Sequence, residues 1–300
     1  TKEGEYSMIK KRVEDMNYVD LLSYIEEVNR CPGGKRSIVK MLNTIHLPVN
    51  PKILEIGSNT GFTSIELSKL LKDAEIIGID VNQNAVEKSE ELLSREVYEV
   101  QKNISFQLGD ASNLEFDTEY FDLIVTGGAN TFVSEEKRSK AIQEYKRVLK
   151  PNGFLSITQL FYDKPVPKKI LDELEGVLGF RIKPWRRSYW LNLFLETNFE
   201  LFEYKEYELQ ERSVEELNQY VDYIIENSPT LKDENSETVE KIKRRWFEIM
   251  AVFNKNHRYL SYMTVVLRNS KVEEQREFFF EKGVDDPWII RQEEEYWYEK

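Results

Sequence analysis

The sequence predicts an α/β fold built around a mostly parallel β-sheet. Residues 53–56, apolar except for Glu55, are typical of a buried strand, and a turn of small residues, 57–61, separates this strand from a predicted helix, Phe62 to Leu71. Further strand patterns alternate with helical patterns along the chain, which is typical of a parallel sheet. Parallel strands place their carboxyl ends on one edge, and open α/β sheets bind ligands at that edge.

The turn after the first strand suits close approach by a ligand. Gly57 and Gly61 have no Cβ atom, so the backbone can come close to a bound molecule. The helix that follows directs its free N–H groups and the positive end of its dipole towards the same place. The turn therefore predicts a site for a nucleotide-like ligand that carries a carboxylate or a phosphate.

The next two predicted strands end in carboxylates that suit the parts of a nucleoside. Strand 75–79 ends at Asp80, whose carboxylate can accept hydrogen bonds from two hydroxyls of a ribose. Strand 104–108 ends at Gly109, Asp110 and Ala111, and the second carboxylate can accept from an exocyclic amine such as that of adenine. The two strand ends thus predict a ribose contact and a base contact beside the turn.

Taken in chain order, these motifs resemble those of the class I S-adenosylmethionine-dependent methyltransferases. A fourth strand, 121–125, and the turn 150–153 before a fifth strand, 154–159, also match the family pattern. The resemblance covers roughly residues 50–205. One departure is Asn59, where the family most often has a second glycine, but asparagine tolerates left-handed backbone angles better than most residues.

The resemblance implies a Rossmann-like, seven-stranded, mostly parallel sheet with helices on both faces and an antiparallel last strand. It also implies S-adenosylmethionine as cofactor and S-adenosylhomocysteine as product. The residues that it places against the cofactor are Glu55, Gly57, Ser58, Asn59, Gly61, Phe62, Asp80, Val81, Gly109, Asp110, Ala111, Thr126 and Gly127.

A nicotinamide-dinucleotide site is the nearest alternative. Its fingerprint requires glycines at positions 57, 59 and 62, but Asn59 and Phe62 stand here, so a pyrophosphate would meet side chains. Asp80 would serve either cofactor. Asp110 favours the methyltransferase interpretation, because the dinucleotide-binding pattern of dehydrogenases assigns no role to a carboxylate at the end of the third strand.

Composition favours a soluble, cytoplasmic enzyme. The 300 residues contain no apolar run of membrane-spanning length, and the first residues do not read as a secretion signal. The single Cys31 excludes an internal disulfide and fits a reducing compartment. With only His46 and His257 beside it, neither a metal site nor a cysteine–histidine nucleophile pair is expected. The formal net charge of -12 makes nucleic acid a poor partner.

The predicted core comprises residues 51–209 and 259–270. The regions outside this core are expected to be largely helical. Residues 1–50 read as a helical cap interrupted at Pro32-Gly33-Gly34, a loop that resembles one lying against the cofactor in some small-molecule methyltransferases. Residues 210–258 stand where the family has a tight hairpin between strands six and seven. A loop of that length needs its own structure, so we expect a helical insertion that acts as a lid or acceptor cap.

The tail, 271–300, is rich in aromatic residues and is expected to pack rather than remain disordered. It could lie on its own domain, cover the active site, or contribute to a homodimer. The insertion is a second candidate for a dimer contact.

Missing motifs narrow the methyl acceptor. The fourth strand is followed by Thr126, Gly127 and Gly128, without the prolines of base amino-methyltransferases or the acidic ligands of metal-dependent catechol-type sites. Cys31 precedes the first strand and so cannot be the nucleophile of cytosine methylation. The sequence therefore predicts a small-molecule N or O acceptor and in-line transfer by proximity and orientation. A methyltransferase acting on protein or RNA, and a non-catalytic binding module of the same fold, remain alternatives.

The sequence contains few candidates for a catalytic role in methyl transfer or for binding of the methyl acceptor. Tyr162, Asp163 and Tyr189 are weak catalytic candidates, because they follow the fifth strand. Trp185, Tyr189 and Trp190 are candidates for the wall of an acceptor pocket.

Overall fold

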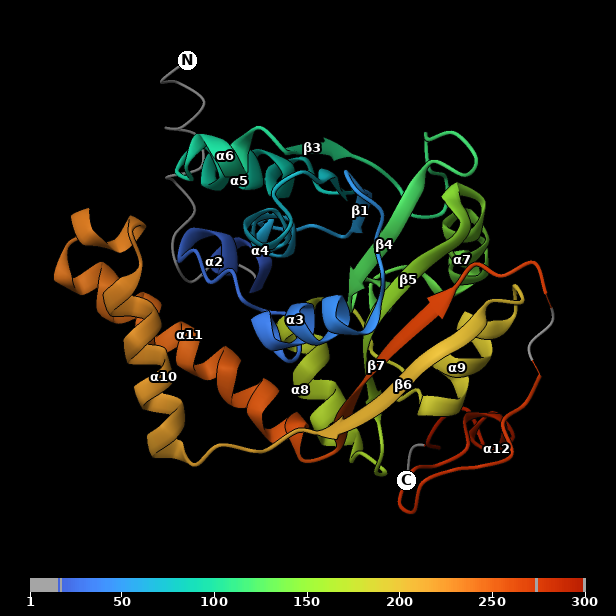
Figure 1. The fold of residues 1–300 in the computed structure, drawn as a ribbon. Helices are drawn as coiled ribbons and strands as arrows, with labels where there is room; N and C mark the ends of the chain where they lie inside the picture. The colour runs from blue at the N-terminus through green and yellow to red at the C-terminus, as the bar shows by residue number, and fades with distance from the viewer. Residues whose placement is uncertain (1–15, 17, 273–274, 299–300) are drawn as a thin grey trace.

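A seven-stranded sheet of order β3-β2-β1-β4-β5-β7-β6 forms the centre of the computed structural model, which describes residues 16, 18–272 and 275–298 (Figure 1). The strands are β1 (Lys52–Ile56), β2 (Glu75–Asp80), β3 (Ile104–Leu108), β4 (Phe121–Gly127), β5 (Leu149–Tyr162), β6 (Glu200–Glu208) and β7 (Leu260–Arg268). Strands β1 to β5 pair in parallel, and β7 lies antiparallel between β5 and β6. The predicted fold class is confirmed.

Helices cover both faces of this sheet. The main ones are α2 (Tyr18–Tyr24), α3 (Gly34–Thr44), α4 (Phe62–Leu70), α5 (Gln83–Ser94), α7 (Glu135–Val148), α8 (Lys168–Leu178), α9 (Arg187–Leu195), α10 (Val214–Asn227) and α11 (Ser236–His257). The short ones are α6 (Tyr98–Gln101), η2 (Ala129–Thr131), η3 (Thr230–Asp233) and α12 (Pro287–Ile290). Helices α3 and α4 pack on one face of the sheet, and α7 and α9 pack on the other.

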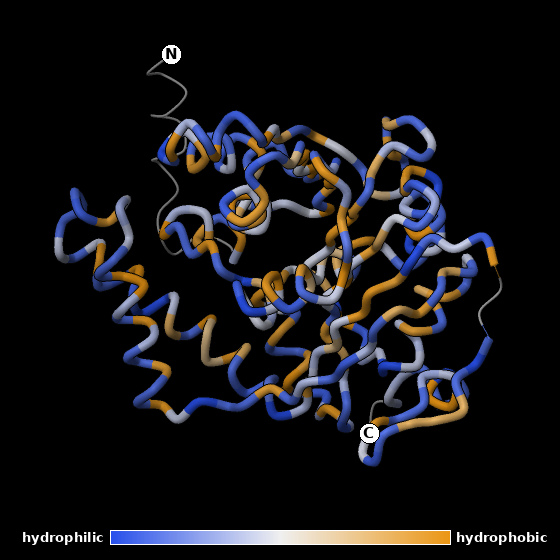
Figure 2. The backbone as a smooth tube through the Cα atoms, in the orientation of Figure 1, coloured by the Kyte–Doolittle hydropathy of each residue, from blue (hydrophilic) through white to orange (hydrophobic). Residues whose placement is uncertain are grey.

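The central strands are apolar on both sides because both sides are covered. In β4, Leu123 and Val125 pack towards α3 and α4, whereas Ile124 packs towards α7 and α9. Figure 2 shows the same arrangement, with hydrophobic residues concentrated along the central strands. This double burial explains why the strands read as continuous apolar runs in the sequence.

One helical cap joins two regions that are distant in the sequence. Leu21 and Ile25 of the N-terminal region share a buried cluster with Val221 of α10 and Trp246 of α11. The hydroxyl of Tyr24 donates to Glu234 at 2.6 Å across 210 positions of the chain. The predicted insertion is therefore helical, and it has a hydrophobic core in common with the N-terminal region.

Local hydrogen bonds define the start of α10, the first helix of the insertion. The Ser213 hydroxyl accepts from the backbone N–H of Glu216, and the Glu216 carboxylate accepts from the backbone N–H of Ser213. This reciprocal pair is a capping box, which satisfies two N–H groups that a helix start would otherwise leave free.

Two elements begin or end elsewhere than the sequence predicts. Strand β5 continues through Tyr162 rather than ending at residue 159, because β7 pairs with it along residues 154–162. The same strand begins at Leu149, so it includes the predicted turn 150–153, and helix α3 starts at Gly34, directly after Pro32-Gly33. Within the described residues, no helix is long and apolar enough to cross a membrane.

The tail folds back on its own domain. Trp288 and Tyr296 pack against the hydrophobic cluster of α9, and Tyr296 forms an isolated bridge with Trp185. The indole Nε1 of Trp297 donates to the carbonyl oxygen of Tyr162 at 3.0 Å. The tail thus closes over the carboxyl end of β5.

Candidate functional site

The turn after β1 has a backbone that requires glycine at two positions. Gly57 has φ +68°, and a Cβ there would lie 2.5 Å from the Cβ of Ala129. Gly61 has φ +79°, and a Cβ there would lie 2.4 Å from the Phe106 ring. Asn59 adopts the left-handed region with φ +46°, as its side chain allows. The turn is therefore tight despite the asparagine.

Asp80 lies directly beside this turn. Its Oδ2 accepts from the backbone N–H of Asn59 at 3.0 Å, and its Oδ1 accepts from the backbone N–H of Asn82 at 2.9 Å. Each carboxylate oxygen can accept a second hydrogen bond. The half-buried carboxylate thus shapes the turn and retains acceptor capacity for two hydroxyls.

Asp110 lies on the wall of a cavity of about 320 Å³ at the ends of β2 and β3. Its Oδ1 accepts from the backbone N–H and the hydroxyl of Ser112, and its Oδ2 accepts from Lys137 Nζ at 3.1 Å. The hydrogen bond from the Ser112 backbone is the main cause that lowers the pKa of Asp110. Lys137 comes from α7, and no sequence motif pointed to it.

The lining of this cavity fits an adenine ring. Besides Asp110, the wall includes the apolar Ile79, Val81, Leu108 and Phe116, together with the polar Gln107, Asn113 and Glu115. An adenine offers flat apolar faces together with an exocyclic amine that can donate to a carboxylate.

Ser58 and Thr126 lie buried beside the turn and the β4 end. The Ser58 hydroxyl in the turn has no hydrogen-bond partner among the described residues, although Ser58 is buried. An orphaned buried hydroxyl at this place suits a polar ligand. Thr126 Oγ1, at the end of β4, accepts from Asn130 Nδ2 at 3.1 Å.

Glu55 lies beneath the turn and holds the start of α4. Its Oε2 accepts from the backbone N–H of Ser64 at 3.0 Å and from the Ser64 hydroxyl at 2.5 Å. Burial raises the pKa of Glu55 to about 7, although the hydrogen bonds from Ser64 oppose this shift. The first turn of α4, including Phe62, is thereby fixed under the ligand-facing backbone.

The raised pKa of Glu55 predicts a pH-dependent stability. The folded protein binds this proton more tightly than the unfolded chain, so the stabilisation is complete below about pH 4.5 and is lost as the pH rises to about 7. Glu55→Gln should therefore gain stability relative to the wild type, by up to about 3 kcal/mol, between pH 4.5 and pH 8. Urea unfolding of both proteins at the two pH values measures the difference.

The matched control for this prediction is Glu87→Gln, which changes an exposed carboxyl group on α5. An identical pH dependence in the wild type and in Glu55→Gln would contradict the assignment.

A loop before α3 crosses the ends of the central strands. The sulfur of Cys31 lies 3.1 Å from the place where a Cβ on Gly127 would be, its thiol donates to the carbonyl oxygen of Pro32 at 3.7 Å, and Thr158 of β5 lies beside it. Burial, with Glu55 as the next cause, raises the pKa of the Cys31 thiol to about 11. The loop with Pro32-Gly33-Gly34 therefore rests on the carboxyl ends of β4 and β5.

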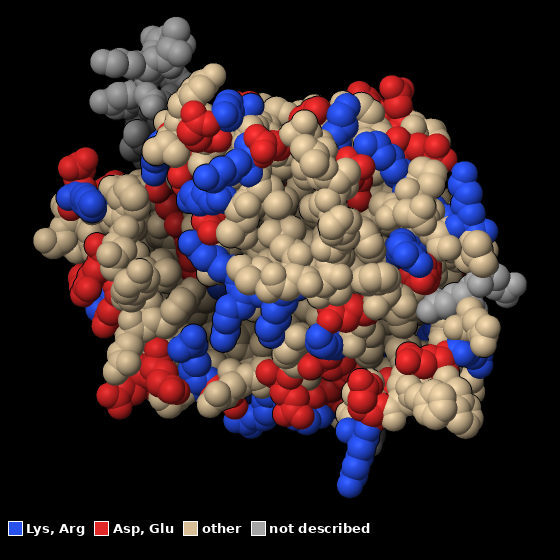
Figure 3. All heavy atoms as spheres, in the orientation of Figure 1, with Lys and Arg blue, Asp and Glu red and all other residues tan. Residues whose placement is uncertain are grey.

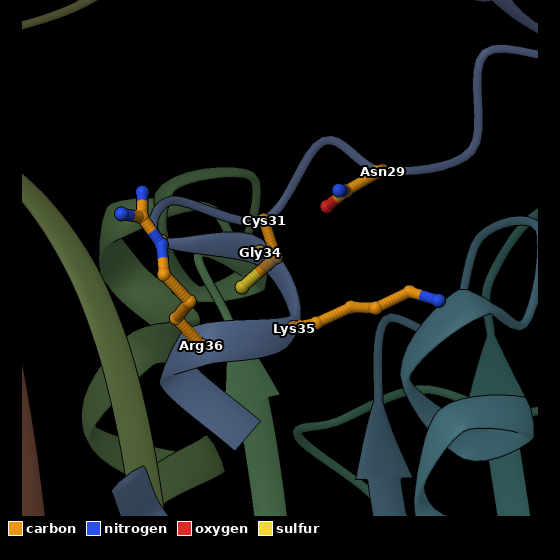
Figure 4. Close-up of a pocket in the computed structure, with 6 residues that line it drawn as sticks. Asn29, Cys31, Gly34, Lys35 and Arg36 are labelled. Carbon is orange, nitrogen blue, oxygen red and sulfur yellow. The ribbon is translucent and has the colours of Figure 1, made fainter. Parts of the chain in front are cut away.

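A second cavity, of about 420 Å³, opens at this loop (Figure 4). It is lined by Asn29, Cys31, Gly33, Gly34, Lys35 and Arg36. In the close-up, Lys35 and Arg36 extend in opposite directions from the first turn of α3. Sequence reasoning did not identify Cys31 as a site residue, and the available signal was its position directly before Pro32-Gly33-Gly34.

Two catalytic candidates, Tyr162 and Asp163, lie at the carboxyl end of β5. Tyr162 is buried at the end of β5, and burial raises the pKa of its phenol to about 12. Asp163 Oδ2 accepts from the Ser261 hydroxyl at 2.9 Å, so both residues lie next to the start of β7. Their catalytic role stays a prediction.

The aromatic candidates lie in the hydrophobic cluster of α7 and α9. Tyr189 stacks on Trp185 with ring centroids 3.6 Å apart, and its hydroxyl accepts from Arg138 Nη1 at 3.1 Å. Trp190 is only 2% exposed. These contacts give the three rings a packing role, and their part in acceptor binding stays a prediction.

Known proteins resemble the chain most over the region that forms these sites. A family described as a methyltransferase domain matches residues 53–153. An uncharacterized protein of Haemophilus influenzae is 30% identical over 168 residues, which is 56% of this chain and 66% of that protein. The phosphoethanolamine N-methyltransferase of Plasmodium falciparum is 33% identical over 126 residues, which is 42% of this chain and 45% of that enzyme. The chain thus spans less than two thirds of these relatives.

Other relatives act on protein, and the solved structures agree in fold. EEF1A lysine methyltransferase 2 of Danio rerio is 25% identical over 168 residues, covering 54% of this chain and 68% of that protein. The crystal structure of MccD protein superposes with a TM-score of 0.66 at 23% identity, covering 80% of this chain and 99% of that one. At this identity the likeness shows the fold.

The motifs, the sheet order and the family match lead to one assignment. The cofactor of the matched family is S-adenosylmethionine, and the turn, the two carboxylates and the adenine-sized cavity fit that molecule. Residues 53–153 thus match a methyltransferase-domain family, and the fold and the site residues are those expected of a class I S-adenosylmethionine-dependent methyltransferase.

Proposed function

We propose that this protein transfers a methyl group from S-adenosylmethionine to a nitrogen or oxygen atom of a small molecule. The observation that carries the proposal is the shared rim, where the 57–61 turn, Asp80 and Asp110 follow three neighbouring strands. Two cavities, of about 320 Å³ at the ends of β2 and β3 and of about 420 Å³ at the loop before α3, would provide room for ligands.

The residues at the rim would bind and orient rather than donate or accept protons. Asp80 would accept from the ribose hydroxyls, Asp110 would accept from the adenine amine, and the Gly57 backbone would allow close approach. When bound, the cofactor supplies a methyl group on a sulfonium, which is a good leaving group. Holding acceptor and methyl carbon in line can supply most of the acceleration such a reaction needs.

The cap would exclude water from the reacting atoms. The loop with Cys31 and Gly33 crosses the ends of β4 and β5, and the helices α10 and α11 continue this cover beside it. Exclusion of water strengthens the electrostatic contacts inside a site and prevents side reactions.

The negative net charge of the chain and the proposed helical cap over the rim favour a small methyl acceptor over a macromolecule. The net charge of -12 opposes a nucleic acid, and a cap over the rim would narrow access to it. Among the relatives, the name of the Plasmodium enzyme gives a small amine as acceptor, whereas the Danio rerio enzyme acts on a lysine. We propose the first kind of acceptor, together with a reducing compartment, which the single Cys31 supports. A homodimer through the insertion or the tail is a further proposal.

The sole thiol of the chain, Cys31, provides a test of the cofactor site. At pH 8 its raised pKa should slow reaction with a thiol reagent roughly 100-fold relative to the unfolded chain. S-adenosylhomocysteine should slow the reaction further, because its amino-acid end would cover the loop. Adenosine alone, which reaches only the adenine side, is the matched control and should protect less.

Calorimetry and product analysis complete the test. Wild-type protein should bind both forms of the cofactor, and labelled methyl groups should appear in a small-molecule filtrate of cell extract. Absence of cofactor binding would favour the non-catalytic module. Label found in retained protein or RNA would replace the small-molecule proposal.

A further inference from the structure

The first two turns of α3 are basic, although the chain as a whole is strongly acidic. Lys35, Arg36 and Lys40 lie there, and Figure 3 shows Lys and Arg side chains gathered over this helix. Lys35 and Arg36 also line the larger cavity. The mouth of this cavity therefore has a charge opposite to that of the whole molecule.

The nearby carboxylates are already engaged. Glu66 binds Lys35 at 3.0 Å and Lys69 at 3.2 Å. Glu203 of β6 pairs with Lys205 and accepts from the Thr44 hydroxyl at 3.3 Å. Among the residues that the structure describes, no carboxylate lies within salt-bridge distance of Arg36. Its guanidinium is thus available to an anion from outside.

Two tyrosines of β6 and β7 lie beside the basic end of α3, outside the residues that line the cavity. Tyr207 and Tyr262 stack with ring centroids 4.9 Å apart, and Lys40 Nζ lies 4.5 Å from the Tyr207 ring centroid. The Tyr262 hydroxyl reaches the loop, 3.2 Å from where a Cβ on Gly33 would be. Burial raises the pKa of Tyr262, while the charge of Arg36 opposes this shift. The phenol therefore stays a hydrogen-bond donor near the guanidinium.

We propose that Arg36, with the Tyr262 hydroxyl and Lys40, binds an anionic group of the methyl acceptor, either a phosphate or a carboxylate. The inference rests on the proposed function, because the same loop places Cys31 on Gly127 at the β4 end of the rim. A guanidinium can bind either anion through two parallel hydrogen bonds, and a phenol can add a third. The acceptor is thus an acidic small molecule, with its anion at the mouth and its nucleophile towards Gly127.

The test uses protein loaded with S-adenosylhomocysteine and two probes, inorganic phosphate and acetate, in calorimetry. Wild-type protein should bind at least one probe, and the stronger one identifies the anion class. Arg36→Gln should weaken that binding about tenfold, as expected for loss of a charge-assisted hydrogen bond. Tyr262→Phe should weaken it by a smaller factor.

The matched control is Lys205→Gln, which removes one exposed positive charge next to the same helix but one already paired with Glu203. It should change probe affinity less than about twofold, since exposed pairs contribute little. Neither Arg36→Gln nor Lys205→Gln should change the affinity for S-adenosylhomocysteine.

Three results would overturn the proposal. They are no binding of either probe to the loaded wild type, equal binding by wild type and Arg36→Gln, and weaker S-adenosylhomocysteine binding by Arg36→Gln. The third would assign Arg36 to the amino-acid end of the cofactor. Failure of the proposed function is distinct, because the wild type would then bind no cofactor at all.

Discussion

Asp80→Ala should weaken S-adenosylmethionine binding about 100-fold or more. The variant loses a carboxylate that can accept from two ribose hydroxyls, and each charge-assisted hydrogen bond contributes about 1.5–3 kcal/mol. It also loses the bonds from the Asn59 and Asn82 backbones, so the turn becomes less ordered. Both effects act in the same direction. Calorimetric titration of wild type and variant measures the change.

Two further variants make this result specific. Asp73→Ala removes an exposed carboxylate from the turn before β2 and should bind the cofactor as the wild type does. Asp80→Asn keeps the size of the side chain but offers only one carbonyl acceptor, so its affinity should be intermediate. Wild-type affinity in Asp80→Ala would contradict the placement of the ribose.

Trp246→Ala should destabilise the protein by about 3–5 kcal/mol, as large-to-small changes of buried aromatic residues do. Trp246 is fully buried in the cap core and stacks on Tyr18 with ring centroids 6.0 Å apart. Removal of the indole leaves a cavity between α11 and the N-terminal region. The midpoint and slope of urea unfolding, followed by circular dichroism, measure the loss.

An exposed aromatic residue in the same cap is the control. Tyr223 of α10 is 63% exposed, and Tyr223→Ala should stay within about 0.5 kcal/mol of the wild type. A similar small effect of Trp246→Ala would mean that the shared core contributes little to the stability of the whole chain.

Local sequence patterns were sufficient for the sheet and for the rim. The strand before Gly57 and the strand before Asp80 are short apolar runs bounded by small or acidic residues, and each occupies the place its pattern predicts. The capping box at Ser213 is equally local. In each case the chemistry that decides the structure lies within a few residues of sequence.

Contacts between distant segments could not be predicted in this way. The pairing of Lys137 with Asp110 depends on how α7 crosses the sheet, and the position of Cys31 depends on where the loop meets Gly127. The length of β5 depends on its pairing with β7. Tertiary neighbours decide these features, and a single sequence does not reveal them.

The bond between Tyr24 and Glu234 has a consequence for how the protein is made. Helix α2 leaves the ribosome before its partners in the insertion, which follow 210 positions later. At ordinary synthesis rates this delay is roughly 10 to 40 s. During that time the apolar face of the nascent helix α2 lacks the native surface on which it packs. We therefore expect ribosome-associated chaperones to bind this segment early in synthesis.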